Sequence, residues 1–275
     1  MLGHDYYHQS LRKYVILFGT VFNDLHVIRR DANNNIFQQI KVPLTYAPRE
    51  KVTARLEQNL NLDSQESIIL PRMSFEMTGL QYSPERKLNT LNRYTKADPN
   101  NPNKKFNSYN PVPYDILFDL NIYTRYAEDA TAILEQILPF FTPEWTGTIN
   151  LIPELDTKVD VPIVIQGLSS QDTYEGDFET RRALIWSIQF VMKGYLFGPI
   201  RNTGVIKKAN TRFFTSNTSG GWATEPAVAA MIKPGLDQFR QPTSNGQITI
   251  SVDEIKATDD YGLIVDFEDY FNESQ

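Results

Sequence analysis

The sequence contains no cysteine among its 275 residues and only three histidines. The absence of thiols excludes disulfides, thiolate metal sites and cysteine nucleophiles, and it argues against a small secreted scaffold held by cross-links. Long apolar runs are also missing near the amino terminus, where YVILF at residues 14–18 is far too short to cross a bilayer. We therefore expect a soluble protein made in a cell's cytoplasm, with no membrane partner.

Familiar catalytic and nucleotide-binding motifs are absent as well. The sequence has no phosphate-binding glycine loop, HExxH helix, calcium loop, GxSxG elbow or dinucleotide fingerprint. His4 and His8 are four residues apart, as metal ligands on a helix can be, but a metal site needs further ligands and this pair lies at the terminus. We predict no catalytic residue, no metal site and no cofactor.

Negative charge is concentrated at the carboxyl end. Residues 252–275 hold eight acidic side chains and one lysine, so the rest of the chain is nearly neutral although the formal net charge is −6. A nucleic-acid interface needs clustered lysine and arginine, so we expect no direct sequence-specific nucleic-acid partner. The acidic groups Asp259–Asp260 and Asp266–Glu268–Asp269 could bind a divalent cation or act as acid and base, which leaves open a carboxylate-dependent hydrolase acting on glycan or peptidoglycan. The simpler interpretation is a solvated or partner-binding charge run.

Hydrophobic periodicity predicts an α+β body in residues 1–200. Residues 10–22, 48–60 and 124–138 show helical spacing, with Thr124 as the expected cap of the third helix. Alternating segments at residues 70–83, 114–124, 146–152, 159–169 and 181–198 predict strands, and 25–47 a hairpin. Because adjacent strands look hairpin-connected, we predict a largely antiparallel sheet with two or three helices packed on one face.

Two segments lack any period. Residues 83–113 are rich in Asn, Pro and Lys, and we expect one long surface loop there, since such connections in compact domains are usually mobile or functional. Residues 201–275 carry isolated aromatics and end in an acidic, aromatic tail, which predicts an extended, partly irregular arm that lies across another surface.

Candidate interface residues follow from the enrichment of arginine and aromatic side chains at protein contacts. Surface ion pairing explains the three arginines among them about as well. We select residues at the entrance of the third helix, before the last body strand and along the arm: Tyr123, Arg125, Tyr126, Arg181, Arg182, Phe213, Phe214, Trp222, Asp266, Phe267, Tyr270 and Phe271.

Several strings in collinear order, VPLTYA, ILPR, YTRYAEDA…EQILPFF and RRALIWS, resemble the tail sheath stabiliser and completion proteins of T-even-type contractile-tailed phages. The resemblance covers residues 5–215. It implies a tail-terminator-like fold and a structural, non-enzymatic virion protein. It also implies a homo-oligomer, a hexameric ring at the head-proximal end of the tail, whose partners are the tail sheath, the tail tube or its terminator, and the neck proteins.

Overall fold

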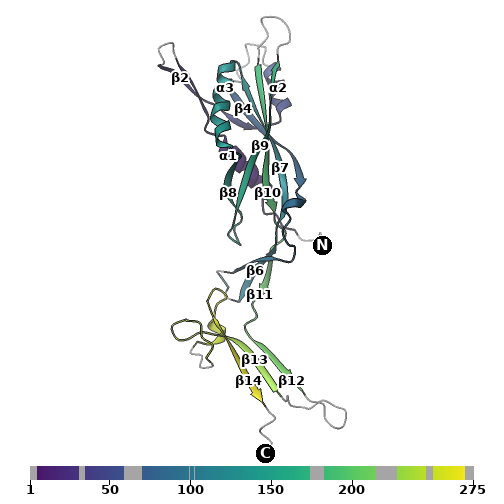
Figure 1. Ribbon diagram of the computed structural model, residues 1–275, viewed down its shortest axis with the longest axis vertical. Helices are drawn as coiled ribbons and strands as arrows, with labels where there is room; N and C mark the ends of the chain where they lie inside the picture. Colours follow the sequence, from purple (N-terminus) through teal and green to yellow (C-terminus); the bar gives the residue numbers. More distant parts are fainter. Residues whose placement is uncertain are drawn as a thin grey trace, which may run out of the picture. The chain divides into compact units, whose positions relative to one another are not determined.

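The computed structural model describes residues 5–30, 35–58, 70–98, 100–101, 103–173, 183–214, 228–245 and 250–269. The chain divides into two compact units (Figure 1). The first unit comprises Met1–Asn92 and Asn110–Gly198, and the second comprises Arg93–Tyr109 and Pro199–Gln275. The chain therefore passes between the units three times.

A six-stranded sheet organises the first unit, in the order β3-β4-β7-β10-β9-β8. The β3–β4 pair is parallel, and every other neighbouring pair is antiparallel, which confirms the expected largely antiparallel sheet. The strands are β3 (Leu44–Tyr46), β4 (Arg72–Tyr82), β7 (Val112–Thr124), β8 (Glu144–Ile152), β9 (Thr157–Thr173) and β10 (Ala183–Leu196).

Aromatic packing joins helix α1 (Ser10–Val21) to one face of this sheet. Phe18 of α1 is fully buried and stacks on Phe118 of β7, with ring centroids 4.4 Å apart, and it also contacts the rings of Phe75 and Phe190. The alternating residues of β7 on this face are also fully buried, as their spacing predicts: Ile116, Phe118, Leu120 and Ile122. Burial of so much apolar surface is the main stabilising term of the unit.

Helix α3 (Ala127–Ile137) covers the same face of the sheet. A turn of 3₁₀ helix (Leu138–Phe140) containing Pro139 follows it, and Phe141 then packs on Phe190 beside α1. The strands β1 (His26–Arg30) and β2 (Ile36–Lys41) form the expected hairpin as a separate two-stranded sheet. Gln136 of α3 donates to the carbonyl of His26 at 2.8 Å, which attaches the hairpin to the helix.

Helix α2 (Arg49–Gln58) covers the opposite face, which corrects the expectation that all helices share one face. Its buried Val52 packs against Tyr123 and Ile185, and these two strand residues point away from the α1 side. The alternation of the strands could not reveal the position of α2. In β7, Tyr123 directly follows a buried residue of the other face, so two consecutive buried residues replace the alternating pattern there. Figure 1 shows α3 and α2 on opposite sides of the sheet.

The second unit consists of two three-stranded sheets. One has the order β11-β6-β5 and contains β5 (Arg93–Ala97), β6 (Lys104–Tyr109) and β11 (Arg201–Gly204). The other has the order β12-β13-β14 and contains β12 (Ala209–Phe213), β13 (Val228–Gly235) and β14 (Gly262–Asp269). Short 3₁₀ helices lie at Pro84–Arg86, in the first unit, and Val252–Glu254, in the second.

Three sequence expectations differ from this structure. Within the expected loop of residues 83–113, β5 and β6 pair as a hairpin, and β6 also pairs with β11, which lies almost a hundred residues later. The described part of residues 201–275 contains four strands and is more regular than the expected arm. The third helix begins at Ala127, preceded by Tyr126, because Thr124 is the last residue of β7. None of the helices in the described ranges is both long and apolar enough to cross a membrane.

Candidate functional site

The entrance of α3 brings together charged and aromatic side chains from two elements. Arg29 of β1 donates to Asp129 through Nη2 to Oδ2 at 2.6 Å and Nε to Oδ1 at 3.2 Å, and Asp129 is only 3% exposed. The guanidinium groups of Arg29 and Arg125 lie 5.4 and 5.7 Å from the centroid of the Tyr126 ring. Cation–π contacts of this kind attract the guanidinium groups to the face of the exposed ring. Arg125 and Tyr126 are thus predicted contact residues that do lie on the surface.

Tyr123 lies inside the first unit instead. Its side chain is fully buried, its hydroxyl lies 3.2 Å from the Ser74 hydroxyl, and it donates to the carbonyl of Arg49 at 3.4 Å. Burial raises the pKa of the phenol, so the group stays neutral. Tyr123 joins β7 to α2, and its ring offers no exposed contact in this chain.

The hairpin beside α3 carries an apolar surface that the sequence analysis did not select. Ile28, Ile36 and Phe37 are exposed, and Phe37 reaches 79%. We call these three residues the hairpin surface. Hydrophobic residues on a two-stranded ribbon have little sheet to cover them, and such patches commonly mark interaction sites. The signal that the sequence offered is three large apolar residues in a hairpin whose strands are only five and six residues long.

The β12-β13-β14 sheet presents an apolar face in the second unit. In β14, Leu263, Val265 and Phe267 are exposed and alternate with Ile264, which is buried, and Asp266. The register places Ile232 opposite Val265. We call Phe213, Ile232, Leu263, Val265 and Phe267 the apolar sheet face; all five are exposed, Phe267 at 73%.

Of the predicted arm residues, Phe213 and Phe267 belong to this apolar sheet face, and Phe214 follows β12 in an exposed position. Asp266 lies on the other side of β14, where its carboxylate pairs with Lys233 at 2.5 Å. The remaining predicted contact residues lie outside the described residues: Arg181, Arg182, Trp222, Tyr270 and Phe271.

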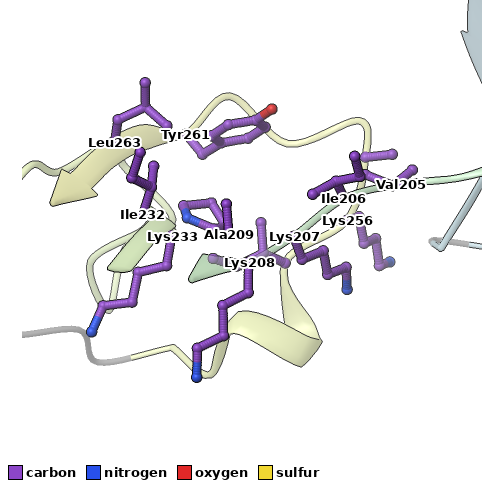
Figure 2. A pocket seen from close by; sticks show the side chains of 13 residues that line it. Val205, Ile206, Lys207, Lys208, Ala209, Ile232, Lys233, Lys256, Tyr261 and Leu263 are labelled. Atoms are coloured by element: carbon purple, nitrogen blue, oxygen red, sulfur yellow. The ribbon is translucent and has the colours of Figure 1, made fainter. Parts of the chain in front are cut away.

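A hollow of about 170 Å³ lies at the edge of the apolar sheet face. Figure 2 shows Tyr261 and Leu263 on one side of it and the ammonium ends of the lysines on the other. We call it the lysine-edged hollow. Its lining combines apolar side chains with four lysines: Val205, Ile206, Ile232, Tyr261 and Leu263, together with Lys207, Lys208, Lys233 and Lys256.

Carboxylates suited to catalysis would lie close together, and one pair in the described ranges is adjacent, Glu76 with Asp119. No group of three or more His, Cys, Asp or Glu side chains there could hold a metal ion. Glu76 and Asp119 are register partners on β4 and β7. Burial, with a smaller effect of the Glu76 charge, raises the pKa of Asp119. Of the acidic residues selected from the sequence, Asp259 pairs with Arg240 at 3.0 Å and Asp266 pairs with Lys233.

Comparison with known proteins agrees with the resemblance seen in the sequence. Residues 5–265 match the family model described as T4-like virus Myoviridae tail sheath stabiliser. The match thus extends past residue 215 into β14. The tail completion protein gp15 of Enterobacteria phage T4 is 30% identical over 221 residues, which cover 78% of this chain and 79% of that protein. The chain belongs to the T4-like tail sheath stabiliser family.

Proposed function

We propose that this chain forms a ring, a hexamer by the resemblance, at the head-proximal end of a contractile phage tail. There it stabilises the extended sheath and the end of the tube, and it offers the surface to which the neck of the filled head attaches. The observation that carries the proposal is the family match across residues 5–265, which includes both structural units. The family is one of tail proteins, and a structural role in the virion tail follows from membership.

The distribution of exposed apolar side chains supports assembly. A head-to-tail ring needs two different complementary patches on every subunit. The hairpin surface is in the first unit and the apolar sheet face is in the second. Arg125 and Tyr126 add arginine and tyrosine, the residue types that most often dominate binding energy, beside the hairpin surface.

Native mass spectrometry and negative-stain microscopy of the purified chain test the ring. We expect a discrete closed oligomer of six copies, and specific binding of that oligomer to the head-proximal ends of tails assembled without it. A strictly monomeric chain at high concentration that does not bind tail ends would contradict the proposal.

The hydrolase alternative is tested separately. Peptidoglycan zymography of the wild-type chain should show no clearing. Clearing that disappears in the Glu76→Gln/Asp119→Asn variant would favour an enzyme, because these two carboxylates face each other across paired strands.

A further inference from the structure

We propose that the lysine-edged hollow binds residues 268–273 of a second copy of this chain, with the Tyr270 and Phe271 rings inside it and the neighbouring carboxylates against its lysines. The inference deepens the proposed function and rests on its homo-oligomer, since it names one contact between subunits. The size of the hollow, its charge and the reach of the chain carry the inference.

The hollow is large enough for aromatic rings. Its volume is about 170 Å³, whereas a single water molecule needs only about 10–15 Å³ on the same measure. Ile206 and Tyr261 in its lining are exposed, so an incoming ring would cover apolar surface that now faces solvent. Burying such surface is favourable because it removes apolar atoms from water.

Three of the four lysines have side-chain charge to offer an acidic partner. The exception is Lys233, which is paired with Asp266. Lys207 donates to the backbone carbonyl of Asp253, and because this acceptor is neutral, the bond does not neutralise the positive charge of Lys207. Lys208 and Lys256 are exposed. Asp259, whose carboxylate accepts from the backbone N–H of Lys256, pairs with Arg240 at 3.0 Å. Figure 2 shows the lysine ammonium ends spread along one side of the hollow.

The chain itself contains a segment of matching chemistry. Residues 268–273 read EDYFNE, with three carboxylates around two adjacent aromatic residues. Three carboxylates match the charges of Lys207, Lys208 and Lys256. Complementary charge of this kind sets orientation and speeds encounter, while the aromatic rings supply the apolar contact.

The reach of the chain excludes a contact of the segment with its own hollow. Leu263 lines the hollow near the start of β14, and the strand continues to Asp269. Six residues of strand at about 3.3 Å each carry the backbone roughly 20 Å away. Tyr270 and Phe271 follow directly, and two residues span at most about 7 Å. The rings therefore need a hollow on another copy, and the resulting head-to-tail contact can repeat around a ring.

Binding of a labelled peptide tests the contact. The probe is a fluorescent peptide with the sequence of residues 266–275, and the acceptor is the full chain carrying Tyr270→Ser and Phe271→Ser, whose hollow no neighbour fills. We expect saturable binding by fluorescence anisotropy that weakens with added salt. A peptide with the same two serine substitutions should not bind.

Charge reversal on the acceptor locates the site. Adding Lys208→Glu and Lys256→Glu should weaken binding at least about tenfold, through like-charge repulsion. Lys104→Glu with Lys158→Glu is the matched control, since both lysines are exposed and outside the lining. Equal affinity of both acceptors, or equal binding of both peptides, would overturn the inference.

Native mass spectrometry of the same proteins separates this inference from the proposed function. A hexamer of the double-serine chain together with no peptide binding would overturn the contact and leave the ring intact. A monomeric wild-type chain that nevertheless binds the peptide would support the contact and count against the ring.

Discussion

The hydroxyl of Tyr14 in α1 bonds to both backbone groups of Tyr195 in β10, donating to its carbonyl oxygen at 2.8 Å and accepting from its N–H at 2.8 Å. Tyr14 is fully buried, and burial raises the pKa of its phenol to about 12 from an ordinary value of 10.0. This pair attaches α1 to the sheet at a point where ionisation of the phenol is strongly disfavoured.

Tyr14 therefore makes the free energy of unfolding depend on pH in the alkaline range. Because the folded pKa lies above the unfolded one, the contribution is complete below pH 10 and is lost as the pH rises towards about 12. The loss amounts to about 2–3 kcal/mol for a shift of this size. Tyr14→Phe should be less stable at pH 7, by about 1–2 kcal/mol, but its free energy of unfolding should fall less between pH 10 and 12. Urea unfolding at each pH measures both curves, and parallel curves would refute the assignment.

Arg29→Met should destabilise the first unit. It leaves the Asp129 carboxylate buried without its cation, which costs about 1–3 kcal/mol for a hydrogen-bonded charged group. The measurement is the free energy of urea unfolding at pH 7. Arg125→Met is the control and should change it by less than about 0.5 kcal/mol, because Arg125 is exposed.

A compensating change sharpens this test. In Arg29→Met/Asp129→Leu the buried charge is gone, so most of the lost stability should return. A double variant as unstable as Arg29→Met would show that the guanidinium acts through packing on Tyr126 and not through the ion pair.

Gly235→Ala should loosen the β12-β13-β14 sheet without affecting the first unit. A Cβ at Gly235 would lie 2.4 Å from the carbonyl oxygen of Thr243, a backbone atom, and 2.4 Å from Ile264 Cδ1. Overpacking of this kind costs about 1–3 kcal/mol. Hydrogen exchange should accelerate in β13 and β14 and stay unchanged in β7. Gly204→Ala is the matched control, because nothing lies within 4 Å of the added Cβ.

Arg125→Ala should weaken assembly while leaving the fold intact. Its side chain lies on the exposed Tyr126 ring, and truncation of an arginine that acts as a binding hot spot costs about 2 kcal/mol or more of binding. Sedimentation velocity should show the oligomer dissociating at least at roughly tenfold higher protein concentration than the wild type. A wild-type ring from this variant, with unchanged unfolding energy, would limit the α3 entrance to a packing role.

Local pattern predicted the first unit well because β7 alternates in burial along its central part, with the face under α1 and α3 fully buried. The alternation of β7 and the apolar stripe of α3, with Ala130, Ile133, Leu134 and Ile137 buried, are direct consequences of period 2 and period 3.6. The pattern could not assign α2 to the opposite face of the sheet. The face that a helix covers depends on which other helices already cover the sheet, and the sequence of α2 does not contain this information.

Prediction failed where pairing is long-range. The strand KKFNSY at Lys104–Tyr109 has little apolar alternation, and its partner β11 lies beyond the whole of the remaining first unit. Only Phe213 and Phe267 of the apolar sheet face were selected from the sequence. An alternating strand predicts that one side is buried, yet Leu263, Val265 and Phe267 are exposed in this chain, which is where an assembly partner is expected to supply the missing cover.

The insertion of Arg93–Tyr109 between two strands of the first unit has a mechanical consequence. Because the backbone passes between the units at three points, severing any single crossing leaves two others intact. Tension that pulls the two units apart is thus shared among the three backbone connections between them. A tail component of this design would keep its two halves tethered through a sudden contraction or a proteolytic nick that would detach a domain joined by one linker.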